Sequence, residues 1–150
     1  MSWLHGVGRS VRSNVGVRSC YEPVVFFKLK VDSFTVDKNN LQNKSFSFAV
    51  RIVNLCKILR YERKEYTLSN QLMRLGTSIG ANICETQQAQ SRADFLSKLN
   101  IALKEASETE YWLRLLEAAD YLTKSEFESM YTDCDELVKI LVSSVRTIKN

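Results

Sequence analysis

Residues 75–85 read LGTSIGANICE, and this stretch decides how the chain folds. Gly76 and Gly80 stand four residues apart inside an apolar helical pattern, where a glycine costs about 1 kcal/mol relative to alanine. Close packing against another helix offsets that cost, because a helix face without side-chain bulk lets a neighbouring backbone approach. We therefore predict that Gly76 and Gly80 mark the place where two helices lie closest together.

A row of polar side chains adjoins the two glycines. Ser78, Asn82 and Glu85 recur at steps of four and three residues, which places them on one side of a helix. Glu105 and Glu108 form a similar row in the helix that we predict to follow. We interpret these five residues as a buried polar network that fixes the register of two facing helices.

The fold class follows from the rest of the pattern. After residue 44 the chain has no proline, and its only glycines are the two named above, so it can be helical throughout. Apolar residues recur at three- and four-residue steps over about residues 45–61, 67–89, 91–119 and 123–150. Four helices with short connections predict an all-α fold, an antiparallel up-down four-helix bundle.

Short polar side chains mark the predicted helix starts. The candidate N-caps are Thr67 or Ser69 for the second helix, Ser91 for the third, and Thr123 or Ser125 for the fourth. Asp94 follows Ser91 by three residues, which predicts a capping box. The first helix has an apolar face broad enough for two neighbours, comprising Phe46, Ala49, Val53, Cys56 and Leu59, widened by Phe48, Ile52 and Leu55.

The chain of 150 residues suits one domain that buries a sizeable core. We expect the bundle to span residues 43–150, with no helix before Asn43. Residues 1–42 are expected to form an irregular N-terminal extension. Two explanations of the extension stay open: it is a poorly ordered segment, or residues 1–30 are an artefact of the start site and translation begins at Val31.

Composition indicates a cytoplasmic globular protein. Hydrophobic residues make up 45% of the chain and charged residues 25%, which is ordinary for such proteins. No run of about eighteen apolar residues predicts a membrane span. Cys20, Cys56, Cys84 and Cys134 are widely spaced and form no CxxC pair, so we predict reduced thiols that pack in a core rather than disulfides.

The sequence offers no constellation for catalysis. Rows of glutamates on facing helices resemble di-iron bundles, but those sites also need histidines, and His5 is the chain's only one. Within the predicted bundle we find no serine or cysteine with a histidine near it, and no glycine-rich loop joins a strand to a helix for phosphate binding. We therefore predict no catalytic residue, no cofactor and no metal site, and a protein that is not an enzyme.

Charge is divided unevenly between the two halves of the predicted bundle. Residues 44–90 hold seven Lys and Arg against three acids, a net charge of +4, whereas residues 91–150 hold eight against eleven, a net charge of −3. Three readings stay open: a solvated surface, a face that meets nucleic-acid phosphates, or a face that meets the acidic half of a neighbouring subunit in a head-to-tail ring. The candidate residues are Arg51, Lys57, Arg60, Arg63, Lys64 and Arg74.

Several motifs in order resemble the bacterial four-helix bundle family labelled 23S rRNA intervening-sequence protein. They are FSFAVRIV at 46–53, LMRLGTSIGANICE at 72–85, AQSRADF at 89–95 and LKEASETEYWL at 103–113. The match covers about residues 43–148, whereas the first forty residues match nothing in the family. The family is related to the accessory variability protein of diversity-generating retroelements. The resemblance implies a ring, typically a pentamer, with no known enzymatic activity.

That resemblance also bears on partners. The retroelement relative binds a reverse transcriptase and nucleic acid through basic residues, but residues 44–150 of this chain carry a net charge of only +1. We predict a homo-oligomeric scaffold that binds RNA or a ribonucleoprotein partner through the six basic residues named above. The alternative is a protein-interaction scaffold in which charged faces form the subunit interfaces and no nucleic acid binds.

Overall fold

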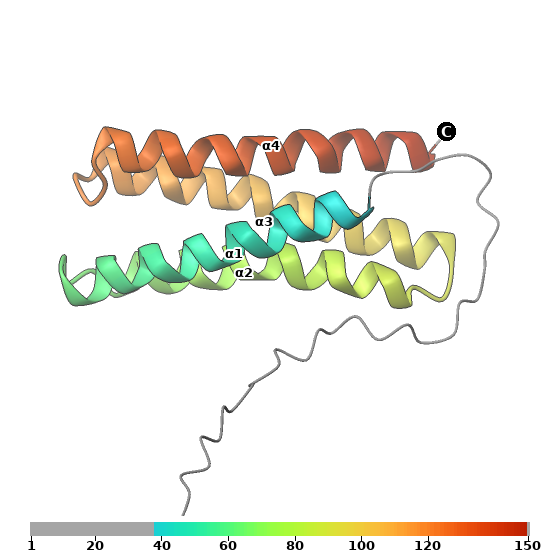
Figure 1. Cartoon of the computed structure of the whole chain (residues 1–150), viewed down its shortest axis with the longest axis horizontal. Helices are drawn as coiled ribbons and strands as arrows, with labels where there is room; N and C mark the ends of the chain where they lie inside the picture. Colours follow the sequence, from blue (N-terminus) through green and yellow to red (C-terminus); the bar gives the residue numbers. More distant parts are fainter. Residues whose placement is uncertain (1–37, 150) are drawn as a thin grey trace, which may run out of the picture. The chain divides into compact units, whose positions relative to one another are not determined.

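A computed structural model describes residues 38–149 of the chain. Within this range four α-helices follow one another: α1 (Lys38–Tyr61), α2 (Thr67–Glu85), α3 (Arg92–Ala118) and α4 (Lys124–Lys149), with a short 3-10 helix, η1 (Thr86–Gln88), after α2. Figure 1 shows the helices alternating in direction. The predicted all-α bundle is confirmed. Predictions for residues 1–37, including those on Val31, His5 and Cys20, lie outside the described residues.

Neighbours along the chain are neighbours in space. α1 packs along α2, α2 along α3 and α3 along α4, whereas α1 meets α4 at far fewer positions. Within residues 38–149, no Cα atom of α1 lies within 8 Å of a Cα atom of α3, so these helices occupy opposite corners of the bundle. None of these helices combines the length and the apolar character needed to cross a membrane.

The caps of α3 and α4 are as predicted. The hydroxyl oxygen of Ser91 accepts a hydrogen bond from the Asp94 backbone N–H at 3.1 Å, and the Asp94 carboxylate accepts one from the Gln90 N–H at 3.2 Å. At the start of α4 the Thr123 hydroxyl accepts from the Glu126 N–H at 3.3 Å, while the Glu126 carboxylate accepts from the Thr123 N–H at 2.8 Å. These reciprocal bonds satisfy backbone donors that a helix start leaves free.

The predicted cap of α2 was wrong. Neither Thr67 nor Ser69 serves as the N-cap, which is Tyr66 without a side-chain bond. Glu65 acts instead, since its two carboxylate oxygens accept from the backbone N–H groups of Leu68 at 2.7 Å and Ser69 at 2.6 Å. Glu65 is buried, and a carboxylate is favoured there because the helix N-terminus is electropositive. α2 also ends at Glu85 rather than Ala89.

Helix α1 differs from expectation at its start and on its faces. It begins at Lys38, so the expectation of no helix before Asn43 was wrong, and Leu41 belongs to the core. Phe46 was expected to face the core but is 68% exposed. The buried side of α1 instead contains Phe48 and Ile52, each at most 1% exposed. α1 is apolar on two sides, so periodicity did not show which side the bundle covers.

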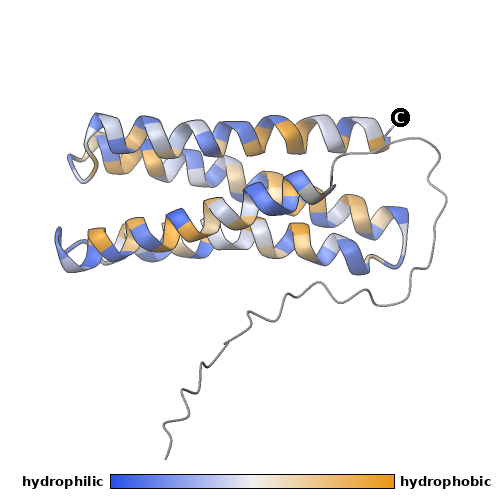
Figure 2. Ribbon diagram, viewed as in Figure 1, coloured by the Kyte–Doolittle hydropathy of each residue, from blue (hydrophilic) through white to orange (hydrophobic). Residues whose placement is uncertain are grey.

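The interior is a continuous apolar cluster from all four helices. Figure 2 shows apolar residues recurring along each helix of the described part. Leu59, Leu72, Ile79, Leu113 and Leu141 are fully covered. Close packing of such side chains is the main source of the bundle's stability.

Two of the three cysteines in the described part are core thiols. Cys56 and Cys134 are buried and unpaired, whereas Cys84 is exposed, against the expectation that it packs in the core. Burial raises the pKa of the Cys56 thiol to about 11, and it raises the pKa of Cys134 as well. Thiols with raised pKa values are poor nucleophiles at neutral pH.

Gly76 lies directly against the Ile52 side chain of α1. A Cβ atom on Gly76 would stand 2.7 Å from Cγ1 of Ile52, which is too short for a real contact. A Cβ on Gly80 would stand 3.5 Å from the Ser45 carbonyl oxygen, an ordinary contact distance. Only the first glycine therefore has no room for a side chain.

Candidate interaction surfaces

Ion pairs join α1 to α4 along the seam where these helices pack least. The Lys44 ammonium lies 2.8 Å from a Glu136 carboxylate oxygen. Seven residues further along α1, the Arg51 guanidinium pairs with Asp133 and donates to the Ser129 hydroxyl at 2.6 Å. Each pair links a cation on α1 to a carboxylate or hydroxyl on α4. Charged hydrogen bonds therefore help to hold α1 to α4, where the two helices meet at few positions.

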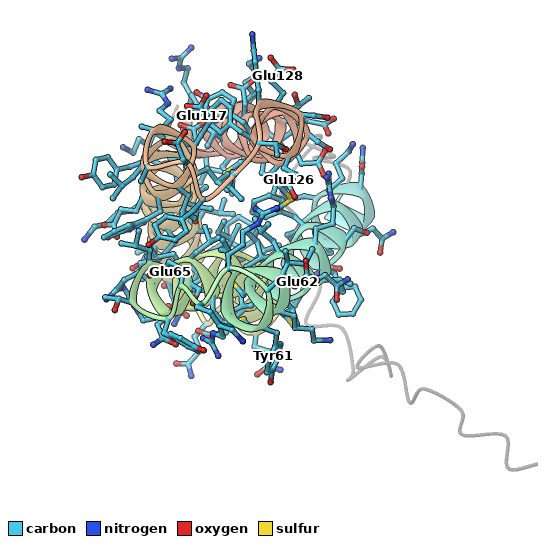
Figure 3. The ribbon with its side chains drawn as sticks, turned by 90° about the vertical axis from the view of Figure 1, so that its left-hand side faces the viewer. Tyr61, Glu62, Glu65, Glu117, Glu126 and Glu128 are labelled. Atoms are coloured by element: carbon cyan, nitrogen blue, oxygen red, sulfur yellow. The ribbon has the colours of Figure 1, made fainter. Side chains whose placement is uncertain are left out.

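Arg63 closes the same seam beside the turns of the bundle. Its guanidinium donates to Glu126 at 2.6 Å and to the Tyr121 carbonyl oxygen. The bond from Arg63, helped by the backbone N–H of Thr123, lowers the pKa of Glu126 to about 2. Figure 3 looks onto this end and shows Glu126 on the side of α4 that faces the first hairpin.

These ion pairs match much of the excess positive charge of residues 44–90 with the excess negative charge of residues 91–150 in the same chain. Three cations of the first hairpin, Lys44, Arg51 and Arg63, bind carboxylates of α4 in the same chain. Arg51 and Arg63 were among the six residues predicted to form a binding face. Their guanidinium groups are already engaged, so their first role in the structure is to hold α1 and α4 together.

The other four predicted binding residues are scattered rather than gathered. Arg60 is half-buried and donates to side chains at the start of α2, including the Ser69 hydroxyl at 3.2 Å. Lys64 and Arg74 are exposed and bond only to groups three residues before them. Lys57 is exposed and makes no ion pair with any residue of the described range. Three of these four cations, Lys57, Lys64 and Arg74, are exposed and have no carboxylate partner among residues 38–149.

The polar row beside the glycines does not form the expected buried network. Asn82 on α2 donates from its amide to the carbonyl oxygen of Ser78 at 2.9 Å and to its hydroxyl at 3.1 Å. Glu85 is exposed and pairs with Lys98 of α3. A bond within α2 and an exposed ion pair to α3 thus take the place of the buried network that we had expected.

The two glutamates of α3 that were predicted to join this network, Glu105 and Glu108, do not do so. One carboxylate oxygen of Glu105 is buried and has no hydrogen-bond partner among the described residues. Glu108 has only a loose pair, at 3.7 Å from the Lys104 ammonium one turn away. Nothing in residues 38–149 joins either side chain to Ser78 or Asn82.

An exposed apolar stripe runs along α1 on the side turned away from the core. Phe46 is 68% exposed, Val50 45% and Tyr61 74%. At about 100° per residue these positions fall on one helix face, together with the half-buried Val53 and the exposed Lys57. We call these five residues the α1 outer stripe. The breadth of the apolar pattern in this helix was the signal for it in the sequence.

A second exposed apolar patch lies on α3. Ile101 is 39% exposed and Tyr111 60%, and the half-buried Leu115 falls on the same helix face. The Tyr111 ring meets the Trp112 ring edge-on, with centroids 5.4 Å apart. We call Ile101, Tyr111 and Leu115 the α3 outer patch. It also faces away from the core residues of its helix.

A shallow hollow of about 240 Å³ opens beside the α1–α4 seam. Phe48 and Leu137 belong to its lining, and the Lys44–Glu136 pair spans its rim. The remaining lining residues are Asn43, Ser47 and Asp133. In the described part of the chain no group of three or more His, Cys, Asp or Glu side chains is placed to hold a metal ion.

Comparison with known proteins identifies relatives of this bundle. The model of the family described as 23S rRNA-intervening sequence protein matches residues 37–143. A solved structure from Bacteroides thetaiotaomicron, described as a protein with unknown function from the S23 ribosomal protein family, is 57% identical. The match covers 73% of this chain and 97% of that chain, with a TM-score of 0.72. No curated protein matches. The chain belongs to the 23S rRNA-intervening sequence protein family.

Proposed function

We propose that the protein is a non-enzymatic scaffold that self-associates through the outer face of α1. The observation that carries this proposal is that α1 has two apolar faces, of which the bundle covers one. Phe46 and Tyr61 on the outer face expose most of their rings to water. A helix that is apolar on both sides is typical of one buried on both sides, and contiguous exposed apolar residues mark interaction surfaces.

The free energy gained by burying these two rings decides how large the interface between copies must be. Covering the exposed parts of two such rings contributes on the order of 5 kcal/mol, from ring areas of about 150–250 Å² each and about 25 cal/mol per Å². Association itself costs about 4–15 kcal/mol. The α1 outer stripe is therefore the centre of an interface, and further contacts surround it.

Light scattering coupled to size-exclusion chromatography tests the proposal. The single chain has a mass of 17.3 kDa, and we expect the wild-type protein to elute as a multiple of it. Phe46→Glu places a charge in the stripe, so this variant should elute as a smaller species with unchanged helical circular dichroism. Ser143→Glu, the same charge change on the exposed polar face of α4, is the control and should keep the wild-type mass. A wild-type mass of one chain would refute the proposal.

A second candidate function is binding of RNA or a ribonucleoprotein through Lys57, Lys64 and Arg74. The observation that favours it is Lys64, which has φ = 57° at the α1–α2 turn. Glycine or asparagine adopts this left-handed conformation more easily, so a lysine there is kept at some cost in strain. A long basic side chain held at an exposed turn suits contact with phosphate.

Fluorescence anisotropy with a labelled structured RNA tests this candidate. Binding should weaken between about 50 and 200 mM salt, because phosphate contacts release counterions. Reversing Lys57, Lys64 and Arg74 to Glu should weaken it further, whereas the control Lys124→Glu should not, since Lys124 lies on another helix near Glu128. RNA affinity that is unchanged by the triple reversal would remove this function.

A further inference from the structure

We infer that the bundle opens along the α1–α4 seam, and that the ion pairs across this seam hold it closed. In this motion the hairpin α1–α2 turns away from the hairpin α3–α4 about the line where α2 packs on α3. The inference concerns a motion within one chain, so it does not depend on the self-association proposed above. It makes the seam a switch that responds to salt.

The two hairpins are held together unequally along their two lines of contact. α2 packs along α3 at many positions, whereas α1 meets α4 at far fewer. Within residues 38–149 the chain passes from one hairpin to the other only once, between the end of α2 at Glu85 and the start of α3 at Arg92. No turn of this described range joins α1 to α4. The line between α2 and α3 is therefore the hinge, and the seam is the side that opens.

Each hairpin keeps its own bonds in the open state. The Cys56 thiol of α1 donates to the Ser69 carbonyl oxygen of α2 at 3.4 Å, and the Cys134 thiol of α4 donates to the Ala106 carbonyl oxygen of α3 at 3.4 Å. Neither bond crosses from one hairpin to the other. Both thiols are fully covered in the core that the two hairpins enclose. Opening therefore leaves these bonds in place but gives water access to both sulfur atoms.

Ion pairs supply much of the attraction across the seam. They are Lys44–Glu136, Arg51–Asp133 and Arg63–Glu126. The six side chains are between 26% and 52% exposed, so water and salt reach all of them. Salt screens such pairs, whereas sodium chloride does not weaken the apolar packing that dominates between α2 and α3. Raising the salt concentration therefore loosens the seam more than the hinge.

Packing is also incomplete at the seam. The hollow of about 240 Å³ opens there, with Phe48 of α1 and Leu137 of α4 in its lining. Side chains that border unfilled space have fewer atoms with which to lose contact when two helices separate. Separating α1 from α4 therefore requires less free energy than separating α2 from α3, where packing is dense.

Alkylation by iodoacetamide measures the opening in the full-length chain. Peptide mass spectrometry follows Cys56, Cys84 and Cys134 separately. Cys84 is exposed and reacts in the closed state, so its rate corrects for any effect of salt on the reagent. Relative to Cys84, we expect both buried thiols to react about two- to tenfold faster in 1 M than in 0.1 M sodium chloride.

Urea unfolding at the same two salt concentrations separates opening from complete unfolding. The free energy of unfolding gives the population of unfolded chains, and a local opening lets both thiols react faster than this population allows. Labelling of Cys56 and Cys134 that is no faster than this limit overturns the inference. A rate that is the same at both salt concentrations overturns it as well.

A matched pair of variants locates the opening. Arg51→Gln removes an ion pair across the seam, whereas Lys98→Gln removes the pair with Glu85 between α2 and α3. We expect Arg51→Gln to speed the labelling of both buried thiols about two- to fivefold in 0.1 M salt, and Lys98→Gln to leave it unchanged. Equal acceleration by the two variants would show that the seam is not the place that opens.

A charge swap provides the test if Arg51→Gln does not fold. Lys44→Glu places two carboxylates together at the seam, since Lys44 lies 2.8 Å from Glu136, and should speed the labelling of both buried thiols. Adding Glu136→Lys restores a pair of opposite charges, so the double variant should react at close to the wild-type rate. A double variant that is labelled as fast as Lys44→Glu alone overturns the inference.

Discussion

At Gly76 the closeness of α1 and α2 reverses the usual effect of alanine in a helix. Replacing a helical glycine by alanine normally stabilises by about 1 kcal/mol. A methyl group at Gly76 would lie 2.7 Å from the Ile52 side chain, which is β-branched, fully buried and unable to move aside cheaply. We predict that Gly76→Ala destabilises the bundle by about 1–3 kcal/mol, the usual cost of overpacking.

Gly80→Ala is the matched control four residues on. Its Cβ would make an ordinary 3.5 Å contact with the Ser45 carbonyl oxygen, so we expect this variant to be as stable as the wild type or more stable by up to about 1 kcal/mol. Urea unfolding followed by circular dichroism measures both variants. Equal destabilisation by the two substitutions would contradict the packing described here.

Glu126 gives the bundle a specific sensitivity to acid. Its pKa is lowered from 4.5 to about 2, first by the bond from Arg63 and then by the N–H of Thr123. A carboxyl whose folded pKa is depressed stabilises the fold above its unfolded pKa, and that contribution is lost as pH falls through the folded value. We therefore predict that wild-type stability falls between about pH 4.5 and 2 partly through Glu126.

Melting temperatures across this range test the assignment. Glu126→Gln should melt below the wild type at pH 7, and the difference should shrink as pH approaches about 2. Glu128→Gln is the control, because Glu128 is exposed and lies 3.9 Å from Lys124, so its effect should be small at every pH. A difference between Glu126→Gln and wild type that stays constant from pH 7 to 2 would rule out this role.

At the scale of elements, the start of α2 depends on Glu65. Both of its carboxylate oxygens accept from backbone N–H groups of the first helical turn. We predict that Glu65→Ala costs about 1–2 kcal/mol, similar to the loss of a strong N-cap. Thr67→Ala, at an exposed position that does not cap, should change the unfolding free energy by less than about 0.5 kcal/mol. Chemical denaturation of both variants decides between Glu65 and the N-cap predicted from the sequence.

Helix starts show which local features a sequence reveals. Ser91 was predicted because Asp94 follows it after three residues, whereas Thr123 was one of two candidates, and its partner Glu126 was recognised only in the structure. Glu65 was missed because it precedes the N-cap and reaches over Tyr66, a geometry that residue spacing alone does not indicate.

Helix α1 shows why the interaction surfaces were harder to predict. Its apolar residues were recognised, and the width of the pattern already indicated two neighbours. Assigning Phe46 to the core failed because both faces of α1 are apolar, and only the positions of α2 and α4 decide which face the bundle covers. The outer stripe therefore became visible only with the tertiary structure.

At the scale of the whole molecule, the sequence predicted the bundle and its family. Only the structure shows which groups the basic side chains contact. The excess of cations in the first hairpin was read as a surface for RNA or for another subunit. Lys44, Arg51 and Arg63 instead reach carboxylates of α4 in the same chain. Sequence alone does not show this, because these partners lie 63 to 92 residues away along the chain.

Apolar and charged interfaces between copies respond differently to salt. Ion pairs between exposed groups are screened over about 3 Å at 1 M salt, whereas burial of apolar surface is not weakened. An assembly centred on Phe46, Val50 and Tyr61 should therefore survive high salt. An assembly held by the charged faces of the two hairpins should dissociate.

The most direct test of the self-associating scaffold is the mass of the wild-type chain by light scattering at 0.1 and 1 M sodium chloride. We predict the same multiple of 17.3 kDa at both concentrations. A mass of one chain at 0.1 M, or an assembly that falls to one chain at 1 M, would contradict an interface centred on the α1 outer stripe.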